Sequence, residues 1–427
     1  RIKPSVGEHP VKEFKKRTRM SPIRDTRELF DGLIQIGDTK ISDRIVPKPP
    51  SVLIKSSSYY MNNRELFINF INSLFAPYKE ELKAEAKSAS CESRNGDKFD
   101  LMAHQKIVRD YINLYTPYRG LLLYHGLGSG KTCSSIAIAE GLKDNRKIIV
   151  MTPASLKRNY FEELKKCGDT MYKKNQFWEF VKSSPDNIKT LASVLNIDEE
   201  YINLQRGAWL VNVKKPPNYE SMSSVEKKSL DKQLDEMIQN KYRFISYNGL
   251  RKSHMNALSM EGGVKHNPFD NAVVVIDEAH NIVSRIVNKL TRKSSTSVSI
   301  ELYELLMSAE NSRIVLLSGT PVINYPNEIA VLFNMIRGYI KTWHLKVVIT
   351  KGGKVTKQTF ADIFSSSTLG GNIADFIDYK STTTTLTITR NPFGFVNKQS
   401  KGMHSGVHLG DRGNMTDDEF ISNITRL

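Results

Sequence analysis

Short apolar runs divide the middle of the chain, and stretches of helical pattern separate them. The five runs cover residues 120–125, 147–153, 243–248, 272–280 and 313–321. Continuous apolar runs that alternate with helices are typical of parallel strands buried on both faces of a sheet. The pattern therefore predicts an α/β fold over residues 98–342, with a parallel sheet and helices on both of its faces.

The segments before this region have a different pattern. Residues 1–60 combine many Lys, Arg and Pro residues with little apolar periodicity, and they predict a basic flexible arm and a linker. Residues 61–97 carry apolar positions at helical spacing, from Leu66 to Phe75. We expect a helical extension there, packed on the main domain.

Two further segments interrupt or follow the α/β pattern. The interval 155–242 shows no clear strand signal, and its second half is charged and helical, so we expect an insertion on the sheet domain. The insertion is compatible with either a solvated surface feature or a segment that binds nucleic acid. Residues 343–427 predict a small, partly β region: 344–360 is expected to form a hairpin around two glycines, and 379–396 is rich in β-branched residues.

Composition narrows the class of protein. The 427 residues are 39% hydrophobic and 25% charged, which indicates a soluble globular chain. No apolar run approaches the roughly 20 residues that span a bilayer, so we expect no membrane partner. Lys and Arg exceed Asp and Glu by 62 to 45, a net charge of +17. That excess favours a polyanionic partner such as nucleic acid, although a solvated basic surface gives the same balance.

The positions of the cysteines indicate whether they form disulfides. Cys91, Cys133 and Cys167 stand far apart, without a CxxC pair or a histidine at ligand spacing. This spacing predicts unpaired thiols in an intracellular reducing compartment, and it argues against a zinc site or a disulfide framework.

The first apolar run ends in the loop HGLGSGKT, residues 125–132. Its glycines allow backbone N–H groups to turn inward around a phosphate at the start of a helix. We expect Lys131 to reach the β and γ phosphates of ATP and Thr132 to ligate Mg²⁺. The residues predicted to cradle the nucleotide are Gly126, Leu127, Gly128, Ser129, Gly130, Lys131 and Thr132.

The run AVVVIDEAH ends in two adjacent carboxylates. Such a pair at a strand end is more often a cap or a solvated edge, but the upstream phosphate loop favours a catalytic site. Asp277 is then expected to hold Mg²⁺ and Glu278 to orient and polarise the attacking water. Lys131 completes the predicted catalytic set.

Three motifs in this order, HGLGSGKT, DEAH and SGTP, resemble the first RecA-like lobe of superfamily 2 helicases and translocases. That superfamily commonly lacks glycine at the first loop position, so His125 fits the resemblance. The resemblance implies an adenine contact for Gln105. It also implies nucleic-acid contacts for Thr152, Pro153, Ser246 and Asn248, and coupling of hydrolysis to movement through His280, Ser318 and Thr320.

Flanking residues narrow the resemblance further. The segments IDEAHN, SGTPVINYPNE and FNMIRGYIKTW are similar to those of helicase-like proteins of large cytoplasmic DNA viruses. That group includes the poxvirus early transcription factor small subunit and nucleoside triphosphatase I. The resemblance implies a role in transcription with DNA favoured over RNA, a transcription complex or partner subunit, and location in the virion and host cytoplasm.

Motors of this superfamily need a second RecA-like lobe with a Q-x-x-G-R-x-x-R segment, and this chain contains none. Arginines from that lobe stabilise charge on the transferring phosphoryl group. We therefore expect the chain to be the N-terminal part of a longer protein, one that binds ATP but hydrolyses it poorly alone.

Three functions remain open on these grounds. The leading hypothesis is the ATP-binding lobe of a nucleic-acid-dependent motor. The alternative is a transcription factor subunit whose nucleotide site switches promoter binding without processive unwinding. A third is a nucleotide-driven protein remodeller with no nucleic-acid partner.

Overall fold

A computed structural model gives the fold of the chain. It describes residues 35–36, 39–40, 44, 72, 75–88, 102–112, 119–126, 128–142, 146–261, 263–291, 297–349, 354–366, 373–391, 395–400, 403–409 and 416–426. The predicted arm and linker, and most of the predicted helical extension, lie outside these residues. In the predicted arm and linker, two short strands are described, β1 (Gln35–Ile36) and β2 (Thr39–Lys40).

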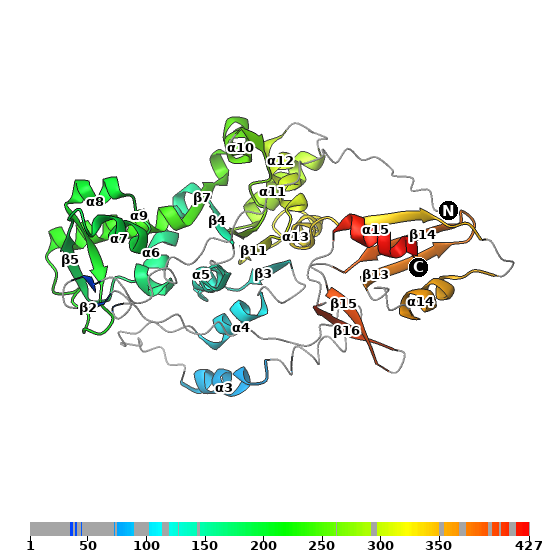
Figure 1. The fold of residues 1–427 in the computed structure, drawn as a ribbon, viewed down its shortest axis with the longest axis horizontal. Helices are drawn as coiled ribbons and strands as arrows, with labels where there is room; N and C mark the ends of the chain where they lie inside the picture. The colour runs from blue at the N-terminus through cyan, green and yellow to red at the C-terminus, as the bar shows by residue number, and fades with distance from the viewer. Residues whose placement is uncertain are drawn as a thin grey trace.

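A five-stranded parallel sheet occupies the centre of the molecule (Figure 1). Its strands follow the order β3-β11-β10-β4-β7, and all neighbours run parallel. The strands are β3 (Gly120–Tyr124), β4 (Lys147–Thr152), β7 (Tyr242–Ser246), β10 (Ala272–Ile276) and β11 (Arg313–Ser318). Each of the five apolar runs in the sequence forms one of these strands, so the predicted α/β fold with a buried parallel sheet is confirmed.

Alternate residues along the strands pack into two separate cores. In β10, Val273 and Val275 join one hydrophobic cluster, while Val274 and Ile276 join the other. All four side chains are 0% exposed. Full burial of such a side chain contributes about 1.5–3 kcal/mol, which explains why these strands are apolar on both faces.

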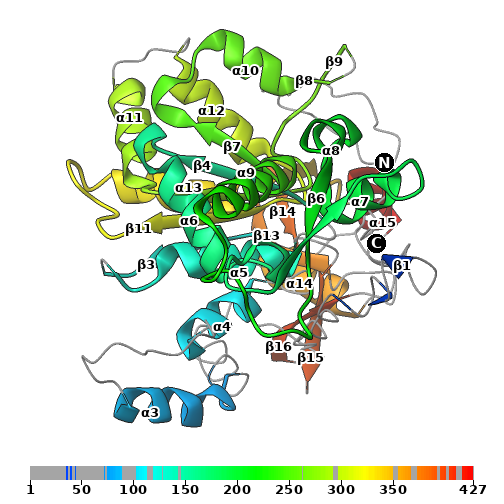
Figure 2. The ribbon, with the colours of Figure 1, turned by 90° about the vertical axis from the view of Figure 1, so that its left-hand side faces the viewer.

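Helices cover both faces of the sheet. One face packs against α4 (Ala103–Tyr111), α5 (Lys131–Leu142), α6 (Lys157–Cys167) and α9 (Ser224–Lys241). The other packs against α10 (Lys252–Ser259), α11 (His280–Thr291), α12 (Val298–Ser308) and α13 (Glu328–Arg337). In Figure 2, α10 to α12 lie above the strands and α5 lies below them. Helix α3 (Tyr78–Ser88) packs on α4, where Lys106 and Glu81 form an ion pair of 2.7 Å.

The interval predicted as an insertion contains two strands that its sequence did not indicate. β5 (Trp178–Lys182) and β6 (Gly207–Val211) pair antiparallel, and α7 (Ile188–Leu195) and α8 (Glu199–Gln205) connect them. This part lies at one end of the molecule, on the left of Figure 1. The helices on either side of it, α6 and α9, belong to the sheet's own core. The charged, helical second half of the interval is confirmed as α9.

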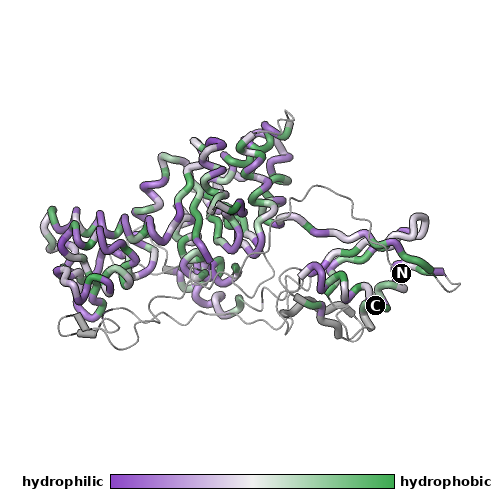
Figure 3. The backbone as a smooth tube through the Cα atoms, turned by 45° about the horizontal axis from the view of Figure 1, so that its top comes forward, coloured by the Kyte–Doolittle hydropathy of each residue, from purple (hydrophilic) through white to green (hydrophobic). Residues whose placement is uncertain are grey.

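The C-terminal region has a core of its own, at the right of Figure 1. An antiparallel sheet of order β12-β14-β13 packs with two helices. Its elements are β12 (Thr342–Lys346), β13 (Ala374–Lys380), β14 (Thr385–Arg390), α14 (Lys357–Ser366) and α15 (Asp417–Arg426). A separate hairpin joins β15 (Phe395–Ser400) to β16 (Met403–Leu409). Figure 3 shows that hydrophobic segments follow the strands at the centre of the molecule.

Two expectations from the sequence are wrong. The segment 344–360 does not form a hairpin, because β12 pairs with the distant β14 and its chain continues into α14; Gly352 and Gly353 themselves lie outside the described residues. Cys133 and Cys167 are not unpaired thiols, because the packing of α5 against α6 brings them together in a disulfide. Within the described part of the chain, no helix is long and apolar enough to cross a membrane.

Short elements complete the described fold. They are the 3-10 turns η2 (Ala154–Leu156), η3 (Thr170–Tyr172) and η4 (Tyr247–Gly249), and the two-residue strands β8 (Met260–Glu261) and β9 (Val264–Lys265).

Candidate nucleotide site

The order of strands gathers three loops at one edge of the sheet. β11 lies between β3 and β10, and its register places Ser318 beside Tyr124 and Leu316 beside Ile276. Parallel strands end at the same edge, where ligands commonly bind in open α/β sheets. The loops after β3, β10 and β11 therefore converge, and they contain the three predicted motifs.

The glycine loop after β3 has the backbone that a phosphate cradle requires. Gly128 and Gly130 have φ angles of +75° and +76°, which side-chain-bearing residues rarely adopt. A Cβ atom built at Gly126 or Gly128 would meet nothing within 4 Å, so the space in front of the loop is open. Ser129 closes the loop through a 2.7 Å bond from Oγ to the Gly126 carbonyl. Leu127 lies outside the described residues.

Lys131 and Thr132 are the first two residues of α5 and stand at its N-terminus. The Lys131 ammonium donates to the carbonyl oxygens of His125 and Gly126, both at 2.9 Å. It also lies close to the loop after β11, because a Cβ at Gly319 would be 3.7 Å from its Nζ. The lysine thus bridges two of the three converging loops.

Gln105 supports the loop from α4. Its side chain is 3% exposed, and its Nε2 donates to the Gly130 carbonyl at 3.3 Å. Its Oε1 accepts a 3.1 Å bond from the backbone N–H of Met102. Gln105 is therefore next to the loop, where the family resemblance led us to expect it, although both ends of its amide are already engaged with backbone groups.

His125, at the position where the general phosphate-loop pattern has glycine, packs against a second histidine. The rings of His104 and His125 stand edge to face, 5.9 Å apart. Burial, followed by His104 and Lys131, lowers the pKa of His125. The imidazole is therefore neutral near pH 7 and adds no charge beside Lys131.

Asp277 follows β10 and is held by the sheet. Its backbone N–H donates to the Met151 carbonyl at 2.8 Å, and its Oδ1 accepts from the Glu278 N–H at 3.0 Å. Burial and the neighbouring Glu278 raise the pKa of Asp277 to about 6, against the opposing effects of the Glu278 N–H and Lys131. A half-buried carboxylate whose charge is costly is suited to hold a cation.

Glu278 adopts a backbone conformation that is unusual for glutamate, with φ of +47°. Tyr247 fixes this turn, because its hydroxyl donates to the carbonyl of Asp277 at 2.9 Å and to that of Glu278 at 3.2 Å. Strained backbone maintained by its surroundings is a frequent feature of functional sites.

The predicted coupling residues His280, Ser318 and Thr320 contact one another in series. His280 Nδ1 lies 3.0 Å from Ser318 Oγ and 3.4 Å from Glu278 Oε2. The Thr320 N–H donates to the same Ser318 oxygen at 3.1 Å. The end of β10 and the end of β11 are therefore joined by the His280–Ser318 hydrogen bond, and the carboxylate of Glu278 lies close to the same imidazole nitrogen.

A cleft of about 580 Å³ opens beside these residues. Its lining comes from the segment after β4 and from the DEAH and SGTP motifs, not from the glycine loop: Pro153, Ser155, Leu156, Glu278, His280, Asn281, Gly319 and Thr320. Sequence reasoning missed Ser155 and Asn281, whose only signal is that they follow Pro153 and His280 closely in the chain.

The predicted nucleic-acid residues are not gathered at one surface. Pro153 lines the cleft, whereas Thr152 is 0% exposed. Asn248 is exposed, and the hydroxyl of Ser246 is buried. The side chain of Thr152 is therefore not available for a contact at this edge.

A family model described as "Type III restriction enzyme, res subunit" matches residues 98–323, which are 226 of the 427 residues. The chain belongs to this family. We call residues 98–323 the res-family segment. It runs from before Gln105 to just after Thr320, so it includes every predicted site residue.

Similar proteins come from large DNA viruses. "Putative ATP-dependent RNA helicase" of Acanthamoeba polyphaga mimivirus is 31% identical over 63% of this chain and 38% of that protein. "Putative helicase" of Invertebrate iridescent virus 3 is 27% identical over 56% of this chain and 20% of that protein. "Termination factor NPH-I homolog" of African swine fever virus is 26% identical over 52% of this chain and 23% of that protein.

These matches confirm the resemblance seen in the motifs. The res-family segment is a superfamily 2 helicase-like ATPase domain, similar to those of large DNA viruses. The chain spans only 20–38% of the length of these three relatives.

Proposed function

We propose that this chain is the ATP-binding motor lobe of a nucleic-acid-dependent ATPase, a helicase or translocase. The observation that supports it most is the convergence of Lys131, Asp277 and Glu278 at one edge of the sheet, beside an open phosphate loop. The lobe would comprise residues 98–342 with the insertion at about 155–242, followed by a separate small region over 343–427.

The roles follow from where each group lies. Lys131, on the helix N-terminus, would neutralise the β and γ phosphates, and the glycine-loop N–H groups would hold them. Thr132 and Asp277 would hold Mg²⁺, which when bound shields phosphate charge and orients the β and γ oxygens. Glu278 would accept a hydrogen bond from the attacking water and polarise it for cleavage of the β–γ bond. Gln105 would contact the adenine through its second amide N–H.

The effect of hydrolysis would be transmitted through the contacts from Glu278 to His280 and from His280 to Ser318. Because Glu278 and His280 line the cleft with Pro153 and Thr320, a shift at the carboxylate would reach the surface where nucleic acid would lie. The net charge of +17 favours a phosphate backbone as partner, and the viral resemblance favours DNA over RNA.

We also propose a place in viral transcription, in the virion and host cytoplasm, as part of a transcription complex. The name of the African swine fever virus relative, a termination factor homolog, supports this role. The alternative is an early transcription factor subunit that binds promoter DNA and uses the nucleotide as a switch, without processive unwinding. In either case the lone lobe should hydrolyse ATP slowly, since a second lobe would supply the arginines.

One set of assays separates these functions. ATP turnover by the chain is measured with single-stranded DNA, duplex DNA or RNA over 50–200 mM salt, beside strand displacement and sequence-specific duplex binding. We expect ATP binding, slow turnover, and nucleic-acid affinity that falls steeply, by at least about tenfold, across that salt range.

The outcomes have distinct meanings. Selective duplex binding without strand displacement would favour the promoter switch. Weak, salt-insensitive binding to both DNA and RNA would overturn the nucleic-acid assignment and favour a protein remodeller. Turnover as fast as that of complete helicases would contradict the need for a second lobe.

A further inference from the structure

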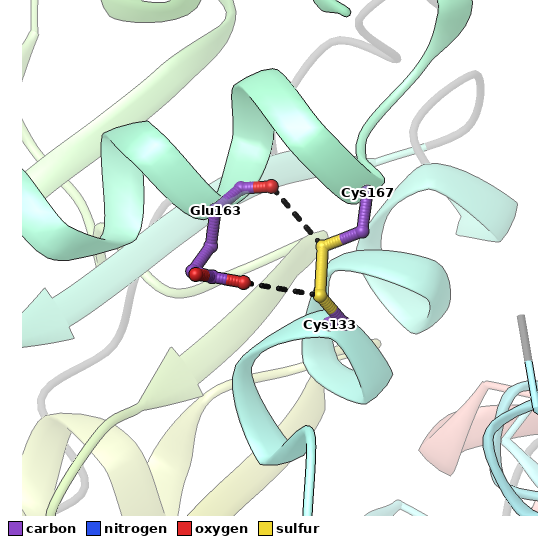
Figure 4. Close-up of side chains that lie close together, drawn as sticks. All are labelled: Cys133, Glu163 and Cys167. Atoms are coloured by element: carbon purple, nitrogen blue, oxygen red, sulfur yellow. Dashed lines mark hydrogen bonds between the residues drawn. A yellow bond between two sulfur atoms is a disulfide. The ribbon is translucent and has the colours of Figure 1, made fainter. Parts of the chain in front are cut away.

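A disulfide joins two helices of the ATPase lobe at a place that the proposed chemistry does not use. Cys133 and Cys167 are bonded, with Cα atoms 5.7 Å apart, a distance ordinary for disulfides. Both residues are buried, at 5% and 7% exposed. Figure 4 shows the bond between α5 and the last turn of α6, with Glu163 beside it.

The two cysteines stand at positions that matter for the site. Cys133 directly follows Lys131 and Thr132 in the first turn of α5. Cys167 is the last residue of α6, the helix that follows the cleft-lining segment 153–156. The disulfide therefore joins the proposed nucleotide helix α5 to the far end of the helix that follows the cleft-lining segment.

A second contact fixes the same pair of helices. Ser135 Oγ and the Tyr160 hydroxyl lie 3.0 Å apart in the buried interface between α5 and α6. This hydrogen bond and the core around it keep the helices adjacent without the disulfide. Reduction should therefore loosen the lobe rather than unfold it, which a reversible device requires.

Glu163 provides both sulfur atoms with an acceptor when they are thiols. Its Oε2 lies 3.3 Å from Cys133 Sγ, and its backbone carbonyl oxygen lies 3.1 Å from Cys167 Sγ. A carboxylate beside a thiol accepts a hydrogen bond from the S–H group, and its negative charge opposes formation of the thiolate, the form that attacks disulfides. Glu163 is thus placed to slow exchange and keep the pair from scrambling.

We propose that Cys133 and Cys167 form a redox-responsive clamp that locks α5 to α6 behind the phosphate loop. Oxidation breaks two S–H bonds and forms one S–S bond. The two electrons and two protons pass to a small-molecule disulfide, such as oxidised glutathione, which leaves as two thiols. The clamp forms in an oxidising environment and opens in a reducing one.

Metal binding is the competing use of the same three residues. The ligand atoms of Cys133, Glu163 and Cys167 lie within 4.8 Å of one another. A structural zinc site usually has four protein ligands, and both sulfurs must be separate thiolates. The bonded sulfurs favour the disulfide, and the test below includes the metal.

The first experiment maps cysteines in the full chain after equilibration with defined ratios of oxidised and reduced glutathione. We expect the Cys133 and Cys167 peptides to be cross-linked under oxidising conditions and both alkylated under reducing ones, with Cys91 alkylated in both. Alkylation of Cys133 and Cys167 throughout, or release of stoichiometric zinc from the chain on denaturation, would overturn the clamp.

The second experiment measures thermal unfolding of the oxidised and reduced chain. The bond closes a loop with a sequence separation of 34, so oxidation should raise Tm by roughly 5–10 °C. Cys167→Ser should abolish this shift and Cys91→Ser, the matched control, should retain it. An equal shift in Cys167→Ser would contradict the proposal.

Glu163→Gln tests the part assigned to the carboxylate. Removing its charge should speed exchange of the Cys133–Cys167 bond with glutathione at least about threefold, while the cross-link itself still forms. The exchange rate is measured by quenching the reaction with an alkylating agent at successive times. Unchanged exchange would remove Glu163 from the mechanism.

Discussion

The two ends of the central sheet hold charges of opposite sign. At the carboxyl ends of the strands lie the half-buried acids Asp277 and Glu278, in front of the glycine loop. At the amino ends lie three arginines: the half-buried Arg119 before β3, and the buried Arg146 before β4 and Arg313 at the start of β11. Burial lowers the pKa of Arg119 and of Arg146 to about 10. Burial, followed by the neighbouring Arg146 and Arg119, lowers that of Arg313 to about 9.

The partners differ as much as the charges. Arg119 donates to the carbonyl oxygens of Leu306 and Met335, in the last turns of α12 and α13. Those carbonyls have no partner within their own helices, and a cation there also favours the helix dipole. The acids at the other end face an open loop and a cleft. At one end, backbone carbonyls within the fold therefore engage Arg119, whereas the acids at the other end face the space that a ligand would occupy.

This difference follows from the parallel topology. Helices that connect parallel strands begin at the carboxyl edge and end at the amino edge. The amino edge thus collects helix C-termini, which arginines stabilise, and the carboxyl edge collects helix N-termini, which attract phosphates. Substitutions at the acidic end should change activity, and those at the basic end should change stability.

Replacement of Glu278 by Gln should give the largest effect. Gln keeps the shape but cannot polarise water, so turnover should fall at least about 10²-fold while ATP affinity stays within about twofold. Single-turnover hydrolysis with nucleic acid present measures this. Glu310→Gln, an exposed acid at the amino edge, is the control; wild-type turnover in Glu278→Gln would refute the assignment of the base.

Arg119→Leu should come next, with an effect on stability. It leaves two buried carbonyls without a donor, and urea unfolding should show a loss of about 4 kcal/mol. Arg243→Leu, an exposed arginine on β7, should change stability by less than about 0.5 kcal/mol. Equal losses in the two variants would mean that Arg119 has no special structural role.

Asp277→Asn should raise the stability of the metal-free fold and lower Mg²⁺-dependent nucleotide binding. Because the folded pKa of about 6 exceeds the ordinary 3.8, ionising Asp277 destabilises the metal-free fold by up to about 3 kcal/mol above pH 6. Asn removes that cost, so the variant should be more stable at pH 8. The gain should shrink as pH falls from 6 and vanish below about 4, where the acid is protonated in both states.

Urea unfolding at pH 4, 6 and 8 follows this trend, with Asp186→Asn, an exposed acid, as the matched control. Mg²⁺-dependent nucleotide binding should be lost in Asp277→Asn. A gain that is independent of pH would contradict the buried-charge explanation.

The sequence predicted the carboxyl edge of the sheet far better than the rest of the molecule. Strands such as 272–276 are buried on both faces, so they appear as unbroken apolar runs. The phosphate loop demands glycine at fixed positions, and the φ angles of Gly128 and Gly130 show why. Local chemistry therefore leaves a local signal.

Features that depend on packing between distant parts of the chain left no local signal in the sequence. β6 is five residues long and is surrounded by polar sequence, so its pairing with β5 could not be anticipated. The partners of Arg119 lie 187 and 216 residues away. Cys133 and Cys167 are separated by 34 residues and meet only because α5 and α6 share one face of the sheet.

Equilibrium binding of ATP and Mg²⁺ to the wild-type chain and to Lys131→Ala tests the central claim most directly. The account predicts that the wild type binds and that loss of the Lys131 ammonium raises Kd at least about tenfold. Lys232→Ala, an exposed lysine on α9, should bind like the wild type. Equal affinity in the wild type and Lys131→Ala would contradict the claim that this end of the sheet is the nucleotide site.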